Sequence, residues 1–238
     1  MTRAYNRDCI DAMREYPDKY FELAIVDPPY GINATTMTMG THLTRTGDGY
    51  PGESVAQRLR KGRLNSGGGK LKNRALLQMN CDWDYEPPKQ DYFEQLFLVS
   101  RNQIIFGGNY FNLPTTRGIG CWDKLQPWEN FSQFELIWTS FDCPAFLFRH
   151  SNTGGANREE KIHPTQKPVA LYLYLLQKFA KPGDKILDTH LGSGSSRIAA
   201  HNMCYDFTGF EIDEYYFTLQ EERFAAHAAQ TSLFHMEE

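Results

Sequence analysis

Four consecutive residues bring a carboxylate, two prolines and an aromatic ring together: Asp27, Pro28, Pro29 and Tyr30. They follow an apolar run at residues 23–26, which predicts a short buried strand that the first proline ends. The prolines also stiffen the segment, because each restricts the residue before it. In open α/β sheets, ligands bind beside the carboxyl ends of the strands. A carboxylate and a prolyl carbonyl placed there suit the two hydrogens of an amino group on a nucleobase, and the ring of Tyr30 suits its flat face.

A second set of residues, late in the chain, has the composition of a nucleotide-binding turn. A predicted strand at 185–188 leads into a turn that contains Gly192 and Gly194. Glycine has no Cβ, so the backbone of such a turn can approach a ligand closely. The next predicted strand, at 206–210, ends in Glu211, and an acid at this distance after the turn suits the hydroxyl groups of a ribose.

In combination these motifs resemble the amino-group DNA methyltransferases that use S-adenosylmethionine and carry an Asp-Pro-Pro-Tyr sequence. The segment at 163–168 reads His-Pro-Thr-Gln-Lys-Pro and resembles the start of the helix that lies near the cofactor in that family. The catalytic motif precedes the cofactor motif, which is typical of the permuted, β-class branch. The resemblance covers nearly the whole chain. It implies transfer of a methyl group from S-adenosylmethionine to the N6 amino group of adenine in double-stranded DNA, at a specific site.

The resemblance implies a role for each residue of the first motif. The side chain of Asp27 and the carbonyl of Pro28 would accept hydrogen bonds from the amino group, beside Pro29, and Tyr30 would stack on the base. The base must leave the duplex to reach them, at a cost of a few kcal/mol. An acid at the first motif position goes mostly with adenine in this family, whereas serine goes with cytosine, so adenine is expected.

The resemblance also implies a cofactor site. Asp188 would lie near the methionine amino group of the cofactor, and Glu211 would bind the ribose. His163, Thr165 and Lys167 would lie near the carboxylate, with Asp8 and Cys9 at the adenine edge. The full expected set is Asp8, Cys9, His163, Thr165, Lys167, Asp188, His190, Gly192, Ser193, Gly194 and Glu211.

Four of these residues have alternative interpretations that the sequence leaves open. Asp8 precedes a predicted helix and suits an N-cap, a position that Asp favours. Glu211 and Lys167 could be charges on the surface. Cys9 would act mainly through its backbone.

The sequence departs from the family pattern in two places. Thr189 and His190 stand where the family has Pro-Phe after the aspartate of the glycine turn. A histidine ring there is flat but titratable, which predicts a cofactor affinity that depends on pH. The stretch between Phe141 and His163, where the family reads DNA sequence, is short. The expected recognition segment is therefore 142–162, with polar candidates at Arg149, His150, Asn152 and Asn157, or else the long segment before residue 80.

The overall charge of −4 and the isoelectric point near 6.0 do not indicate a nucleic-acid-binding protein, but local charge decides such binding. Seven basic residues fall between positions 58 and 74 without an acid among them. They predict contacts with DNA phosphates, and a solvated loop is the alternative interpretation. The residues are Arg58, Arg60, Lys61, Arg63, Lys70, Lys72 and Arg74.

Strands and helices alternate along the chain, which predicts a mostly parallel, doubly wound sheet with helices on both faces. A single catalytic domain is expected at 1–238, with a long basic insertion at about 31–80. The resemblance implies a circularly permuted Rossmann-like fold of seven strands, one of them antiparallel. The remaining helices are expected at 10–16, 91–100, 169–181, 195–201 and 214–229, and the remaining strands at 4–6, 103–106, 118–122 and 134–139.

The five cysteines are odd in number and lack Cys-x-x-Cys spacing, which argues against disulfides and a zinc site and favours a reducing, cytoplasmic setting. The chain shows no stretch that predicts a membrane span and no signal-peptide pattern at its start.

Three other functional classes compete with DNA methylation. A nicotinamide enzyme would share the strand, glycine turn and helix, but Arg197 stands where its fingerprint needs a small residue. Methylation of another amino or amide group is the second, and within it RNA remains open, whereas glutamine methylators favour Asn where Asp27 stands. The third is a catalytically silent DNA-binding module, which the intact motifs oppose. A homodimer and a separate restriction nuclease are compatible with the sequence.

Overall fold

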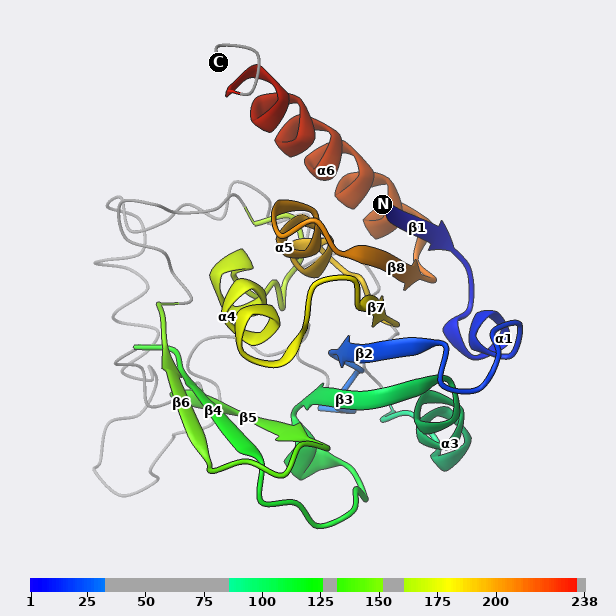
Figure 1. Cartoon of the computed structure of the whole chain (residues 1–238), viewed down its shortest axis with the longest axis vertical. Coiled ribbons are helices and arrows are strands. Elements are labelled where there is room, and N and C mark those ends of the chain that lie inside the picture. The colour runs from blue at the N-terminus through cyan, green and yellow to red at the C-terminus, as the bar shows by residue number, and fades with distance from the viewer. Residues whose placement is uncertain (33–85, 126–131, 152–160, 235–238) are drawn as a thin grey trace, which may run out of the picture.

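The computed structural model describes residues 1–32, 86–125, 132–151 and 161–234, and its centre is a twisted sheet (Figure 1). Within the described residues the sheet has eight strands in the order β1-β8-β7-β2-β3-β5-β4-β6. All neighbours pair in parallel except β5, which is antiparallel to both β3 and β4. The strands are β1 (Thr2–Asn6), β2 (Phe21–Val26), β3 (Ser100–Phe106), β4 (Ile119–Asp123), β5 (Phe134–Thr139), β6 (Phe146–Arg149), β7 (Lys185–Asp188) and β8 (Asp206–Glu211).

The central strands are buried on both faces because helices cover both sides of the sheet. β2 reads Phe-Glu-Leu-Ala-Ile-Val, and five of its six residues are buried. Such near-continuous apolar runs are typical of parallel sheets between two helical layers. β2 pairs with β3 on one side and β7 on the other, so the motif that follows Val26 leaves the sheet at its centre.

Two clusters of apolar side chains form the core, one on each side of the sheet. One contains α4 (Val169–Phe179) and α5 (Ser195–Asn202), and the other contains α1 (Cys9–Met13) and α3 (Gln90–Val99). Figure 1 shows the two pairs on opposite sides of the strands. The long α6 (Glu214–Phe234) follows β8 and extends past the edge of the sheet at β1. This arrangement confirms the predicted Rossmann-like architecture with one antiparallel strand.

The sheet has one strand more than expected, because the recognition segment predicted at 142–162 contributes β6. The sequence of β6 alternates Phe146, Leu147, Phe148 and Arg149, which is the period of a strand with one buried face. Phe146 and Phe148 both pack against Tyr174 of α4, with ring centroids 6.1 and 4.8 Å apart. The strand therefore extends the sheet beside β4, and its buried face packs against α4.

Two helices, α1 and α6, end three or more residues from their expected positions. α1 ends at Met13 instead of Tyr16, because the last residues form tighter turns, with the N–H of Tyr16 donating to the carbonyl of Met13. Pro17 follows, and a residue before proline avoids the helical conformation. α6 continues five residues beyond the expected 229. Across the described part of the chain, no helix has both the length and the apolar character that a membrane span requires.

Candidate active site

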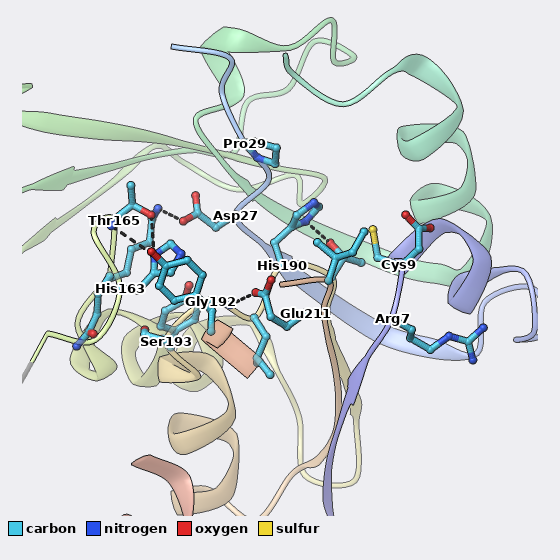
Figure 2. A pocket seen from close by; sticks show the side chains of 18 residues that line it. Arg7, Cys9, Asp27, Pro29, His163, Thr165, His190, Gly192, Ser193 and Glu211 are labelled. Carbon is cyan, nitrogen blue, oxygen red and sulfur yellow. Dashed lines mark hydrogen bonds and ion pairs between the residues drawn. The ribbon is translucent and has the colours of Figure 1, made fainter. Parts of the chain in front are cut away.

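A cavity of about 300 Å³ opens at the carboxyl ends of the central parallel strands (Figure 2). It lies where β2, β7 and β8 end, so residues from both ends of the chain meet there. Its volume is at the lower end of the usual range for small-molecule sites, about 300–1,000 Å³. The sequence-predicted residues that line it are Asp8, Cys9, Asp27, Pro29, His163, Thr165, Lys167, His190, Gly192, Ser193 and Glu211.

Four predicted residues do not line the cavity: Pro28, Tyr30, Asp188 and Gly194. The basic residues expected between 58 and 74 lie outside the described residues, as do Asn152 and Asn157. The cavity is also lined by residues that were not predicted: Arg7, Gln166, Tyr172, Thr189, Leu191, Ile212 and Tyr216.

The glycine turn and the acid after β8 are joined directly. Gly192 has a positive φ of 50°, and its N–H donates to Oε2 of Glu211 over 2.8 Å. The other carboxylate oxygen of Glu211 accepts from the N–H of Asp213 at 2.9 Å. Burial raises the pKa of the Glu211 carboxyl above its ordinary value. The alternative of a surface charge therefore fails, because Glu211 is held against the turn and faces the cavity (Figure 2).

Asp188 ends β7 and lies behind the lining of the cavity. Its Oδ2 accepts from the hydroxyl of Ser196 at 2.5 Å, and its Oδ1 accepts from the N–H of His190 at 3.0 Å. The side chain is almost completely buried, and burial raises the pKa of its carboxyl to about 7. The proposed contact of Asp188 with a cofactor amino group stays a prediction.

Asp8 caps α1, as one interpretation of the sequence required. Its Oδ1 accepts from the N–H groups of Ile10 and Asp11, at 2.8 and 3.0 Å. The residue also lines the cavity, so capping and ligand binding are compatible. Next to it, burial and the charge of Asp8 raise the pKa of the Cys9 thiol to about 12. Cys9 is therefore a neutral thiol, consistent with a contribution through its backbone.

Two histidines of the cavity are uncharged over the physiological range. Burial lowers the pKa of His163 to about 3 and that of His190 to about 4. The ring of His163 packs edge-on against Tyr216, 4.3 Å between centroids, and its Nδ1 lies 3.1 Å from Oγ1 of Thr165. His190 is bonded to Thr189 at 2.9 Å. Both residues therefore offer flat, neutral rings to a ligand, and His190 can take the place of the family's phenylalanine without adding charge.

The Asp27 carboxylate belongs to a buried network of charges. Lys167 forms ion pairs with Oδ2 of Asp27 and with Oε1 of Glu135, the latter at 2.8 Å. The hydroxyl of Tyr30 lies 2.7 Å from Oδ1 of Asp27 and 2.5 Å from Oε1 of Glu135. Burial raises the pKa of the Asp27 carboxyl, against the opposing charge of Lys167. Lys167 is only 4% exposed, so it is not the solvated charge that one interpretation of the sequence suggested.

The ring of Tyr30 is held by its own neighbours. Tyr110 stacks on it with centroids 4.7 Å apart and an interplanar angle of 11°. Phe111 contacts it edge-on at 6.0 Å. Gly107 lies so close that a Cβ there would stand 2.4 Å from Cε1 of Tyr30. The stacking of Tyr30 on a base stays a prediction, and the described structure shows a ring whose orientation is fixed by residues 107–111.

Glu135 and Tyr110 were missed by sequence reasoning. Glu135 sits in β5, in the sequence Phe-Glu-Leu-Ile-Trp-Thr, and its side chain is 11% exposed. A lone acid inside a run of apolar strand residues is a signal, because an acid is rarely buried without a partner. Its partner could not be named from the sequence, since Lys167 is distant along the chain.

The cavity has the groups that S-adenosylmethionine requires. The carboxylate of Glu211 faces the cavity beside the backbone of Gly192, where a Cβ would come 3.7 Å from the ring of His163 and narrow the space. The hydroxyl of Thr165 is a donor for a carboxylate, and the neutral rings of His163 and His190 offer apolar surface. Acids, a hydroxyl and flat rings around one cavity suit a ligand with a ribose, an amino acid end and a purine.

The sequence matches the family model described as DNA methylase over residues 70–222, well over half of the chain. It is 22% identical to the type II methyltransferase M2.MboI of Moraxella bovis, over 92% of this chain and 86% of that protein. It is 31% identical to the type II methyltransferase M.HpaI of Haemophilus parainfluenzae over 34% of this chain and 26% of that protein.

Solved structures share the fold. The M1.HpyAVI complex with S-adenosylmethionine aligns with a TM-score of 0.52 at 17% identity, covering 94% of this chain and all of the other. The PvuII DNA methyltransferase, described as cytosine-N4-specific, aligns with a TM-score of 0.54 at 13% identity over 95% of this chain and 90% of that one. Since the family model spans most of the sequence and the fold agrees, the chain belongs to the DNA methylase family.

Proposed function

We propose that this chain transfers a methyl group from S-adenosylmethionine to the N6 amino group of adenine in DNA. One observation carries the proposal: Asp27, from the end of β2, lines the same cavity as Gly192 and Glu211. The amino-group motif and the nucleotide-binding turn therefore face each other, although more than 160 residues separate them. Such a meeting is required of a methyltransferase and has no purpose in a silent DNA-binding module.

S-adenosylmethionine is the methyl donor, and its sulfonium supplies an activated methyl group. The carboxylate of Glu211 would bind the ribose hydroxyls, and the residues around Asp8 and Cys9 would meet the adenine. Thr165 and His163 would face the carboxylate of the cofactor. These assignments are those that the family resemblance implies, and they are supported by the presence of all these residues on the cavity wall.

The residues around Asp27 would prepare the amino group of the target base. The lone pair of this nitrogen is delocalised into the ring, so it is a weak nucleophile. Hydrogen bonds from its N–H groups to Asp27 and to the carbonyl of Pro28 would return electron density to nitrogen and orient its lone pair. The raised pKa of the Asp27 carboxyl suits it to take up the proton that the nitrogen loses. Most of the rate enhancement would come from positioning, since the methyl group arrives activated.

Adenine is favoured over cytosine because an acid stands at position 27, an association within the family that the chain resembles. The base would have to leave the duplex, and stacking on an aromatic ring returns about 1–3 kcal/mol of that cost. The basic residues between 58 and 74 would contact phosphates, so binding should weaken as salt rises. A second subunit and a partner nuclease are compatible with the proposal and are not needed for methyl transfer.

The test is to incubate the protein with tritiated S-adenosylmethionine and unmethylated DNA, digest the DNA and identify the labelled nucleoside. We expect N6-methyldeoxyadenosine. The Asp27→Ala variant should lose transfer while it still binds S-adenosylmethionine. Label in N4-methyldeoxycytidine would overturn the choice of base, and wild-type turnover by Asp27→Ala would refute the role of Asp27. A parallel incubation with RNA tests whether RNA is also a substrate for methyl transfer.

A further inference from the structure

Glu135 reaches the candidate active site from β5 and has no role in the proposal above. Its side chain is 11% exposed and makes three polar contacts. Oε2 pairs with Lys124 at 3.0 Å, and Oε1 meets both the ammonium of Lys167 at 2.8 Å and the hydroxyl of Tyr30 at 2.5 Å. Two of these partners, Lys167 and Tyr30, are also the two partners of Asp27.

The Tyr30 hydroxyl has one proton but faces two carboxylates. It can donate to Oδ1 of Asp27 or to Oε1 of Glu135, and at any moment it donates to only one of them. When the proton points to Glu135, Oδ1 of Asp27 loses a donor. An incoming N–H group can then take that place, and neither Asp27 nor Tyr30 has to move.

Lys167 holds both carboxylates, Asp27 and Glu135, in place. Its ammonium contacts Oδ2 of Asp27 and Oε1 of Glu135, and its Nζ lies 3.4 Å from the oxygen of Tyr30. The three donors of a lysine ammonium are therefore directed at this network. One cation between two carboxylates holds both in place, so removing Glu135 would let Lys167 and the Asp27 carboxylate shift.

We propose that Glu135 is a positioning residue for methyl transfer. It holds Lys167 in place through their ion pair and accepts a hydrogen bond from the hydroxyl of Tyr30. Oδ1 of Asp27 is then open to the amino group of the substrate. The inference rests on the proposed function, because it assigns Asp27 to that amino group. Glu135 does not line the cavity, so it acts on the reaction through Asp27 and makes no contact with the cofactor.

Charge gives the proposal an independent readout. Burial and Glu135 raise the pKa of the Asp27 carboxyl, and Lys167 lowers it. Loss of the Glu135 charge should therefore move the acidic limb of the kcat profile to lower pH, and loss of the Lys167 charge should move it to higher pH. The titratable groups that interact electrostatically with Asp27 are Tyr30, Tyr92, Glu135, Lys167, Tyr172 and Asp188.

The experiment compares Glu135→Leu, Glu135→Gln and Lys167→Met with a matched control, Glu221→Leu. Glu221 pairs with the buried Arg197 at 2.6 Å, outside the cavity, so its loss also leaves a buried cation without its ion pair. We expect kcat to fall roughly 10- to 100-fold in Glu135→Leu, with the affinity for S-adenosylmethionine unchanged by calorimetry. Glu135→Gln keeps an acceptor for Tyr30 and should recover part of the rate. Glu221→Leu should keep the wild-type rate.

Two results would overturn the proposal. One is wild-type kcat in Glu135→Leu. The other is a fall in kcat in Glu135→Leu without any shift of the acidic limb, if Glu221→Leu shows an equal fall or if Glu135→Gln does not recover part of the rate. Should Glu135→Leu fail to fold, Glu135→Gln and Lys167→Met still give the opposite pH shifts. Titration of the Asp27 carboxyl by carbon NMR needs no turnover, so it tests the network even if the wild-type protein methylates no DNA. If the pKa of Asp27 in Glu135→Gln equals that in the wild type, the inference is refuted.

Discussion

Gly107 sets the position of Tyr30, and replacing it with alanine should separate catalysis from cofactor binding. Gly107 has a φ of +66°, and an added Cβ would stand 2.4 Å from Cε1 and 2.5 Å from Cζ of the Tyr30 ring. Ordinary contact for a Cβ begins at 3.4 Å, so the ring must move by about 1 Å. The hydroxyl at the end of that ring is bonded to Asp27, so the displacement reaches the residue that we assign to the amino group.

The expected magnitude has two parts. An alanine with positive φ costs about 1–2 kcal/mol, and forcing a buried ring aside adds about 1–3 kcal/mol. Gly183→Ala is the matched control, because Gly183 has a φ of +91° and an added Cβ there meets nothing within 4 Å. It should lower the melting temperature by about 2–8 °C and leave kcat unchanged. Gly107→Ala should melt lower still and lose about 100-fold in kcat, the usual scale for a 1 Å misplacement.

The assay is methyl transfer at saturating cofactor and DNA, with melting temperatures and calorimetric binding of S-adenosylmethionine measured on the same samples. Gly107 does not line the cavity, so cofactor affinity should be equal in both variants and wild type. If Gly107→Ala kept the kcat of Gly183→Ala, the position of the Tyr30 ring would not matter to catalysis. The connection from Gly107 through Tyr30 to Asp27 would then be wrong.

Three further predictions concern the cofactor side of the cavity. Glu211→Ala should weaken S-adenosylmethionine binding about 10- to 100-fold by calorimetry, the scale of a charged hydrogen bond, and unchanged affinity would exclude the ribose role. Because burial lowers the pKa of His190 to about 4, this ring should add no pH dependence to cofactor affinity between about pH 6 and pH 8, contrary to the expectation from the sequence; a pH dependence that His190→Phe removes would contradict this. Burial raises the pKa of Asp188 to about 7 from its ordinary 3.8, so the folded protein retains a proton that the unfolded chain releases. Without cofactor, the stability gained from that proton should therefore decline as pH rises from about 4 to about 7, and Asp188→Asn should melt without that decline; the same profile in both proteins would refute it.

The elements with strong apolar patterns could be predicted from the sequence almost to the residue. β7 begins at Lys185 and ends at Asp188 as predicted, because a short buried run lies between a polar turn and a glycine turn. The strands predicted at 118–122 and 134–139 correspond to β4 and β5, which pair antiparallel. β6 could not be predicted, since four residues of alternating pattern form a strand only where β4 and α4 offer them a partner and a surface.

In the candidate active site, too, some features could be predicted from the sequence and others depend on contacts between distant segments. Asp27 and Glu211 were predicted to lie near a ligand because each ends a strand of a parallel sheet, and strand ends share one edge. The network around Asp27 could not be predicted, because its members come from the segment after β2, from β5 and from the segment before α4. Spacing within one segment says nothing about which charges meet across a fold.

The order of the motifs along the chain has no effect on the site, because the sheet places them by pairing. β2 and β7 are neighbours in register, Leu23 beside Ile186 and Ala24 beside Leu187, so the residues that follow both strands emerge at the same edge. β8 pairs with β7 on its other side and brings Glu211 to that edge as well. A circular permutant that began at β7 and ended with α4, the helix before it, would keep the same strand neighbours and place the same groups around the same cavity. Chemistry at this edge therefore depends on which strands are adjacent, and a permuted sequence can retain the activity of its family.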